Sequence, residues 1–150
     1  MNKVIQYVQK YNVVYFIGIT ILLDLLSAVF LELYFHNTAN DNNFSSIFEE
    51  ILLAIFFAPI IETLIFQFLI IRVTEKFTPS ITIQVLVSAI IFALSHHYSV
   101  SYVMKAFFAG LLYASLFCIA REQRKNAFVV VLISHMIYNS IISLLNYIFY

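Results

Sequence analysis

The chain of 150 residues has few of the residues that soluble domains use: 11% are charged, two are glycine, two are proline and none is tryptophan. Soluble domains carry about 25% charged residues. The net charge is zero, so nothing indicates a nucleic acid or an anionic surface as the main partner. The lone cysteine, Cys118, excludes an internal disulfide and a cysteine-based metal site. No repeat or linker divides the sequence, and we expect one domain over residues 1–150.

Apolar residues dominate instead, at 63% of the chain with a mean hydropathy of +0.94. Five apolar runs approach the roughly 20 residues that cross a bilayer as a helix. These runs cover residues 13–35, 48–71, 81–98, 102–120 and 127–149. They are too continuously apolar for barrel strands, so we predict an all-α polytopic bundle with about five spans. The first run lacks a small-residue cleavage site, which favours a retained span over a signal peptide.

The basic residues predict the orientation of these spans. In a five-span arrangement, seven of the eight basic residues lie on the side of the N-terminus. They are Lys3, Lys10, Arg72, Lys76, Arg121, Arg124 and Lys125. The loops of the other side carry Asp41, Glu49 and Glu50. The positive-inside rule therefore places the N-terminus in the cytoplasm and the C-terminus outside. Lys105 is the exception, and it lies close enough to the outer end of its span to snorkel.

Several polar side chains interrupt the apolar runs, and an ionisable group at membrane depth costs about 2.5–3.5 kcal/mol on insertion scales. Glu62 lies near the middle of the second run, where it can act as a general base on water. The alternative is a protonated acid that hydrogen-bonds between helices. Pro59 frees a backbone carbonyl one turn earlier and permits a kink before Glu62. We expect Asp24 to make a structural contact and Glu32 to reach the interface.

Two further runs carry imidazoles. Phe92 and His96 lie one helical turn apart, and His135 and Asn139 share a face at i,i+4 spacing. An imidazole can transfer a proton, bind metal or donate to an oxyanion, and an amide N–H can stabilise a developing negative charge. Polar contact between helices is the alternative interpretation. Adjacent residues of a helix point about 100° apart, so we expect His97 at the outer interface instead.

A carboxylate, imidazoles and an amide on separate helices suit hydrolysis of a carbonyl substrate by activated water. The sequence has no His-Glu-x-x-His pair, which excludes an ordinary zincin site. It also lacks a Gly-x-Ser-x-Gly elbow. Ser95 and Ser134 each precede a histidine, but neighbouring side chains of a helix diverge. The pattern therefore argues against a serine hydrolase.

With these residues the chain resembles the CPBP intramembrane protease family, also called the Abi, CAAX prenyl protease 2-like or lysostaphin-resistance-like family. The first motif of that family is Glu-Glu-x-x-x-Arg, often after Ala-Pro-x-x. Ala58, Pro59 and Glu62 match this motif. Thr63 stands in place of the second glutamate, and Gln67 stands in place of the arginine.

The other motifs of the family follow in order. The second, Phe-x-x-x-His, resembles Phe92 to His96, and the third, His-x-x-x-Asn, resembles His135 to Asn139. Between them, Gly110 falls in a segment similar to the small-residue helix of the family, where it would allow close helix packing. The order and spacing of these motifs across three spans make the resemblance specific.

The similarity covers about residues 48–146 and implies an intramembrane endopeptidase. It implies that Glu62 and His96 activate the water, while His135 and Asn139 hold the oxyanion. Members of the family are usually labelled metalloproteases. If a divalent metal such as zinc binds, the resemblance implies Glu62, His96 and His135 as its ligands, although the same groups can activate water without metal.

The resemblance also implies a partner and a location. We expect a peptide or membrane-protein substrate in the lipid bilayer of a bacterial cell inner membrane, and no nucleic-acid partner. Bacteriocin processing and self-immunity are the associations of bacterial relatives. A catalytically silent membrane scaffold or immunity protein is the first alternative, because Thr63 and Gln67 are neutral where the family has a charged pair. A small proton- or ion-coupled transporter subunit that uses Glu62 and the histidines as a relay is the second.

Depth raises one difficulty. Glu62 lies about ten residues from Arg72, whereas His96 lies about twenty residues from Lys76. At about 1.5 Å per residue, His96 should then lie further toward the outside than Glu62. A tilted third span, or one that begins in the cytoplasm, would bring the two residues together.

Overall fold

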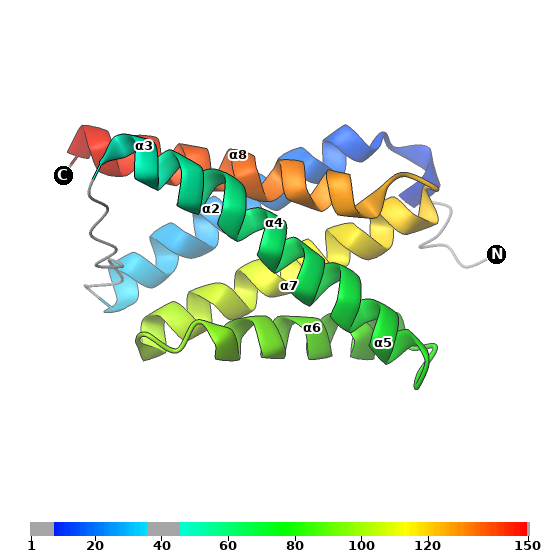
Figure 1. The fold of residues 1–150 in the computed structure, drawn as a ribbon. Helices are drawn as coiled ribbons and strands as arrows, with labels where there is room; N and C mark the ends of the chain where they lie inside the picture. The colour runs from blue at the N-terminus through cyan, green and yellow to red at the C-terminus, as the bar shows by residue number, and fades with distance from the viewer. Residues whose placement is uncertain (1–7, 36–45, 150) are drawn as a thin grey trace.

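The computed structural model describes residues 8–35 and 46–149, and within them every regular element is a helix (Figure 1). Residues 36–45 of the polar stretch expected between the first two apolar runs, at residues 36–46, lie outside the described residues, and so do Asp41 and Lys3. The described helices are α2 (Val13–Phe35), α3 (Ile47–Glu50), η1 (Ile51–Phe57), α4 (Ala58–Glu62), η2 (Thr63–Ile70), α5 (Ile71–Glu75), α6 (Ile81–Ser95), α7 (Val100–Glu122) and α8 (Ala127–Phe149).

The elements α3 to α5 follow one another without a break and form one long helix over residues 47–75. Two of its segments, η1 and η2, are π-helical and flank α4, the short segment that ends at Glu62. Such π segments within α-helices are frequently found at functional sites. The Ser46 hydroxyl caps the beginning of the long helix by accepting a hydrogen bond from the backbone N–H of Glu49.

All five apolar runs form helices, which confirms the predicted all-α membrane bundle. Four of these helices are long and apolar enough to cross a bilayer: α2, the long helix, α7 and α8. Helix α6 has 15 residues and ends at Ser95, earlier than the expected boundary near residue 98. The difference arises because Ser99 is the N-cap of α7, which begins at Val100. The Ser99 hydroxyl accepts a hydrogen bond from the backbone N–H of Tyr102.

The distribution of side chains is that of a membrane protein. Large apolar residues cover the outside of the bundle, for example Phe30, Leu33 and Leu94, each about two-thirds exposed or more. The interior holds polar side chains, namely Thr20, Asp24, Thr63, Gln67, Gln84, Ser88, Ser101, Ser134 and His135. Small and polar residues at helix interfaces are what lipid-embedded helices use for association. Cys118 is buried among apolar residues of α7 and its neighbours.

Helices α6 and α7 approach each other closely because one residue has no side chain. A Cβ atom added to Gly110 would lie 3.0 Å from the Cα atom of Ala89 and 3.0 Å from Cδ1 of Phe92. This finding confirms the close packing expected at Gly110. The long helix crosses α7 in front of this pair, while α8 runs along the opposite side of the bundle (Figure 1).

Candidate active site

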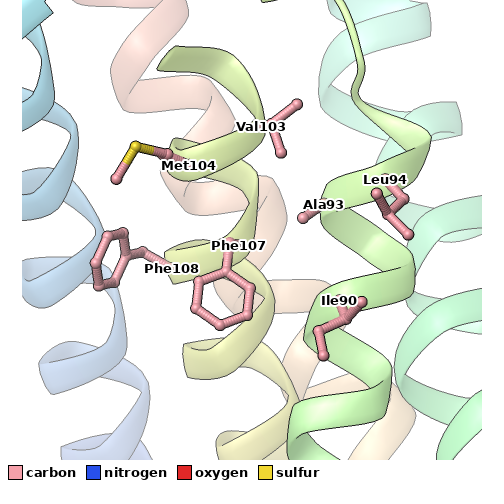
Figure 2. A pocket seen from close by; sticks show the side chains of 7 residues that line it. All are labelled: Ile90, Ala93, Leu94, Val103, Met104, Phe107 and Phe108. Carbon is pink, nitrogen blue, oxygen red and sulfur yellow. The ribbon is translucent and has the colours of Figure 1, made fainter. Parts of the chain in front are cut away.

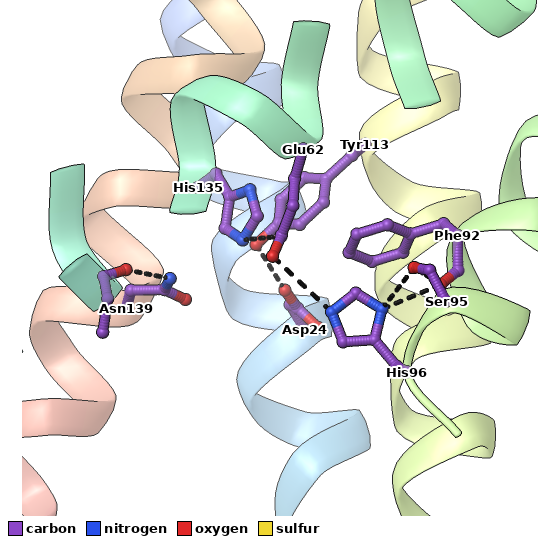
Figure 3. A network of polar contacts seen from close by, with 9 residues as sticks. Asp24, Glu62, Phe92, Ser95, His96, Tyr113, His135 and Asn139 are labelled. Atoms are coloured by element: carbon purple, nitrogen blue, oxygen red, sulfur yellow. Dashed lines mark hydrogen bonds and ion pairs between the residues drawn. The ribbon is translucent and has the colours of Figure 1, made fainter. Parts of the chain in front are cut away.

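Glu62 lies between two imidazoles in the interior of the bundle (Figure 3). Its Oε1 atom lies 3.6 Å from Nε2 of His96, and its Oε2 atom lies 3.5 Å from Nε2 of His135. The side chains are 21%, 15% and 6% exposed, respectively. Three of the four residues singled out in the sequence therefore converge, from the long helix, the end of α6 and α8. Glu62 and His96 keep some access from outside, whereas His135 is enclosed.

The expected difference in depth disappears because α5 and α6 form a hairpin. Glu62 lies thirteen residues before the end of α5 at Glu75, and His96 lies fifteen residues after the start of α6 at Ile81. At about 1.5 Å per residue both lie roughly 20 Å from the shared turn at residues 76–80. The Ser88 hydroxyl also donates to the Phe66 carbonyl at 2.9 Å and joins the two helices.

His96 is held by the helix that it follows. Its Nδ1 atom lies 2.8 Å from the carbonyl oxygen of Phe92. A carbonyl only accepts, so Nδ1 carries the hydrogen of this bond, and a neutral His96 presents an unprotonated Nε2 to Glu62. The Phe92 ring packs edge-on against His96 at 4.5 Å and against His135 at 6.4 Å between centroids. Phe92 thus holds His96 through its backbone carbonyl, and its ring packs against both imidazoles.

His135 is oriented by a residue that the sequence did not reveal. The ring of Tyr113 stacks on its imidazole, with centroids 4.5 Å apart and planes at 29°. The Tyr113 hydroxyl donates to Oδ2 of Asp24 at 2.8 Å. Asp24 therefore makes the structural contact expected for it, and its partner is Tyr113 on α7. A tyrosine inside an apolar run gives no signal in the sequence, because its role depends on which helix faces it.

Asn139 points to a different group. Its Nδ2 atom donates to the carbonyl oxygen of Ala54 at 2.8 Å. In the π-helical register of η1 this carbonyl would accept from residue 59, five positions later, but Pro59 has no N–H. Asn139 thus satisfies the carbonyl that the proline leaves free. No polar contact joins Asn139 to the carboxylate of Glu62 in the described part of the chain (Figure 3).

Thr63 and Gln67, which replace the charged pair of the resembling family, are completely buried. Neither the Thr63 hydroxyl nor the Gln67 amide has a hydrogen-bond partner among the described residues. A buried unsatisfied polar group costs about 1–3 kcal/mol. These two buried side chains therefore make no hydrogen bond with each other.

The arrangement does not fit a zinc ion held by protein ligands. Zinc sites of enzymes gather three protein ligands around one point. Among the described residues no group of three or more His, Cys, Asp or Glu side chains is placed to hold a metal. The two imidazoles approach different oxygens of Glu62, on either side of the carboxylate.

An apolar pocket of about 390 Å³ lies between α6 and α7 (Figure 2). Ala93 and Leu94, just before His96 in the chain, line it from α6. Phe107 and Phe108 line it from α7. His97 is not part of either site: it is exposed, and its ring stacks on that of Tyr98.

Comparison with known proteins adds one match. A family model described as type II CAAX prenyl endopeptidase Rce1-like matches residues 44–141. No curated protein and no solved structure matches the chain. The matched stretch contains Glu62, both imidazoles of the site and Asn139, and it leaves α2 outside.

Proposed function

The chain belongs to the type II CAAX prenyl endopeptidase Rce1-like family, and from this we propose that it hydrolyses peptide bonds inside the membrane with water activated by Glu62. One observation carries the proposal. The Glu62 carboxylate lies between Nε2 of His96 and Nε2 of His135, in the interior of a bundle whose surface is apolar. Both separations exceed a direct hydrogen bond and leave these groups to act on a water or a substrate atom between them.

The proposed chemistry begins with proton transfer from water to Glu62. The hydroxide attacks the carbonyl carbon of the scissile peptide bond, and the carbonyl oxygen takes up the negative charge. His96 faces the same carboxylate with an unprotonated Nε2 when neutral, so it can orient the water by accepting its second hydrogen. Glu62 then returns its proton to the amide nitrogen, and the C–N bond breaks. General acid–base catalysis of this kind contributes typically about 10²–10⁴-fold in rate.

In this proposal His135 and Asn139 stabilise the oxyanion by hydrogen bonds. His135 has no partner at Nδ1 among the described residues, so Nε2 can carry the hydrogen and donate it to the oxyanion. Asn139 uses one amide hydrogen for the Ala54 carbonyl. Its second amide hydrogen remains for the substrate. No step of the proposed reaction passes through a metal.

The substrate in this proposal is an apolar peptide segment or a membrane protein. The pocket between α6 and α7 offers apolar contacts two to three residues from His96 along the chain. We propose a bacterial inner membrane as the location of the protein. Its N-terminus faces the cytoplasm in this proposal, because seven of the eight basic residues lie on the side of the N-terminus. Bacteriocin processing or self-immunity is the setting that we propose for it.

One observation favours a second candidate function. Thr63 and Gln67 are neutral, buried and without hydrogen-bond partners among the described residues. A catalytically silent scaffold or immunity protein would keep this fold without the charged support beside Glu62.

Cleavage by the purified chain in lipid vesicles separates the two candidates. The vesicles carry a membrane-protein extract, and new peptide termini are identified by mass spectrometry. We expect products from the wild type and from Glu122→Gln, a matched change at the end of α7. We expect none from Glu62→Ala or Glu62→Gln. Products that persist unchanged in both Glu62 variants would overturn the protease proposal and leave the scaffold.

A further inference from the structure

Asp24 and Tyr113 form a fully buried hydrogen bond between α2 and α7. The Tyr113 hydroxyl donates to Oδ2 of Asp24 at 2.8 Å, and the two residues are 0% and 1% exposed. Two turns further along each helix, Lys105 interacts electrostatically with Glu32. The hydrogen bond joins α2 to α7 at this level of the bundle. A carboxylate is an expensive way to join two apolar helices, because burial of its charge is unfavourable.

The tyrosine connects this hydrogen bond to the candidate active site. Its ring stacks on the imidazole of His135 at 4.5 Å, while its hydroxyl is held by Asp24 (Figure 3). Functional histidines are usually oriented by a hydrogen bond at the ring nitrogen that faces away from the reaction. That nitrogen, Nδ1 of His135, has no partner among the described residues. The Tyr113 ring, stacked at 4.5 Å, is a closer contact than the Phe92 ring at 6.4 Å, and it lies against the face of the imidazole.

We propose that Asp24 and Tyr113 are positioning residues for His135. Asp24 fixes the Tyr113 hydroxyl, and the tethered ring holds the imidazole so that Nε2 faces Glu62. A phenylalanine would stack as well, but it would be free to slide across the imidazole. The inference rests on the proposed function for its effect on rate. It also makes α2 part of the active site, although α2 precedes the residues matched by the family model.

Substitutions at both ends of the hydrogen bond test the tether. Asp24→Asn keeps the shape and a hydrogen-bond acceptor, so we expect kcat within about threefold of the wild type. Asp24→Leu and Tyr113→Leu remove the tether and the stack, respectively. Because a misplacement of about 1 Å can cost about 10²-fold in rate, we expect kcat to fall by about 10–100-fold with KM unchanged.

Two more variants separate positioning from folding. Tyr113→Phe keeps the ring and loses the tether, so its kcat should lie between those of the wild type and Tyr113→Leu. Thr20→Val is the matched control, because Thr20 is buried on α2 one turn before Asp24. It should leave kcat unchanged. The proposal is overturned if folded Asp24→Leu, judged by its elution in size-exclusion chromatography, retains full kcat, or if Asp24→Asn is as slow as Asp24→Leu.

A second readout does not depend on cleavage. Diethyl pyrocarbonate modifies accessible imidazoles, and mass spectrometry reports the rate at His135. We expect this rate to rise at least fivefold in Asp24→Leu and Tyr113→Leu, and to stay unchanged in Thr20→Val. If the wild type cleaves nothing while these rates rise as expected, the protease proposal fails and the tether stands. If cleavage is normal and neither kcat nor the modification rate responds, the tether fails alone.

Discussion

Gly110→Ala tests whether the contact between α6 and α7 sets the geometry of the site. The added Cβ would lie 3.0 Å from the Ala89 Cα and 3.0 Å from Phe92 Cδ1. The first of these atoms belongs to backbone, which moves only if α6 moves. Helix α6 carries Phe92, whose carbonyl holds Nδ1 of His96 at 2.8 Å. The clash at Gly110 should therefore displace His96 from Glu62.

The size of the effect follows from these contacts. Relief of the clash requires a shift of a few tenths of an ångström, and overpacking of this kind costs about 1–3 kcal/mol. Since a 1 Å misplacement can cost about 10²-fold in rate, we expect kcat to fall by about 3–10-fold. Gly110→Val, with two further methyl groups at the same point, should lower both stability and kcat more.

Gly18→Ala provides the control, since no atom lies within 4 Å of a Cβ added to Gly18. Both glycines are helical, so each substitution gains up to about 1 kcal/mol of helix propensity. Thermal unfolding in detergent and peptide cleavage in vesicles should show a stabilised, fully active Gly18→Ala and an impaired Gly110→Ala. A Gly110→Ala variant as stable and active as Gly18→Ala would refute this account of the interface.

Three further results are expected. Asn139→Ala leaves the Ala54 carbonyl unsatisfied and should lower the free energy of unfolding by about 1–3 kcal/mol. Pro59→Ala supplies an N–H for that carbonyl, so the double variant should unfold at a higher temperature than Asn139→Ala alone. An additive loss of stability in the double variant would contradict the pairing of Asn139 with this carbonyl. Arg124 has φ of 56° in the turn after α7. Arg124→Gly should therefore raise the free energy of unfolding by up to about 1 kcal/mol, measured by chemical unfolding. A lower free energy of unfolding would show that the contacts of the Arg124 side chain outweigh its backbone strain. Cleavage should persist after treatment with a strong chelator, because no three-ligand group is placed for a metal in the described residues; loss of activity that added zinc restores would overturn the metal-free proposal.

The helices could be predicted from the sequence because, inside a bilayer, the backbone N–H and C=O groups of a long apolar run must hydrogen-bond to one another. The end of α6 could not. The sequence after Ser95 is compatible with two outcomes, because its residues are polar enough to form a loop but the next apolar run is close enough for the helix to continue. The Ser99 cap begins α7 at Val100 and decides the boundary.

The site was predictable where polar groups interrupt apolar runs. Glu62, His96 and His135 stood out for this reason, and the structure brings them together. Tyr113 was not visible, since its stacking on His135 depends on the rotation of α7. The partner of Asn139 was also not predictable. The free carbonyl is that of Ala54 only in the π-helical register, and sequence periodicity does not reveal a π segment.

The central claim is that the Glu62 carboxylate transfers the proton of the attacking water. The most direct measurement is the single-turnover cleavage rate of Glu62→Gln in lipid vesicles, since the amide keeps the size of the side chain and removes its basicity. The account predicts a rate lower by about 10²–10⁴-fold, with Glu122→Gln unchanged. A Glu62→Gln rate within a few-fold of the wild type would contradict it.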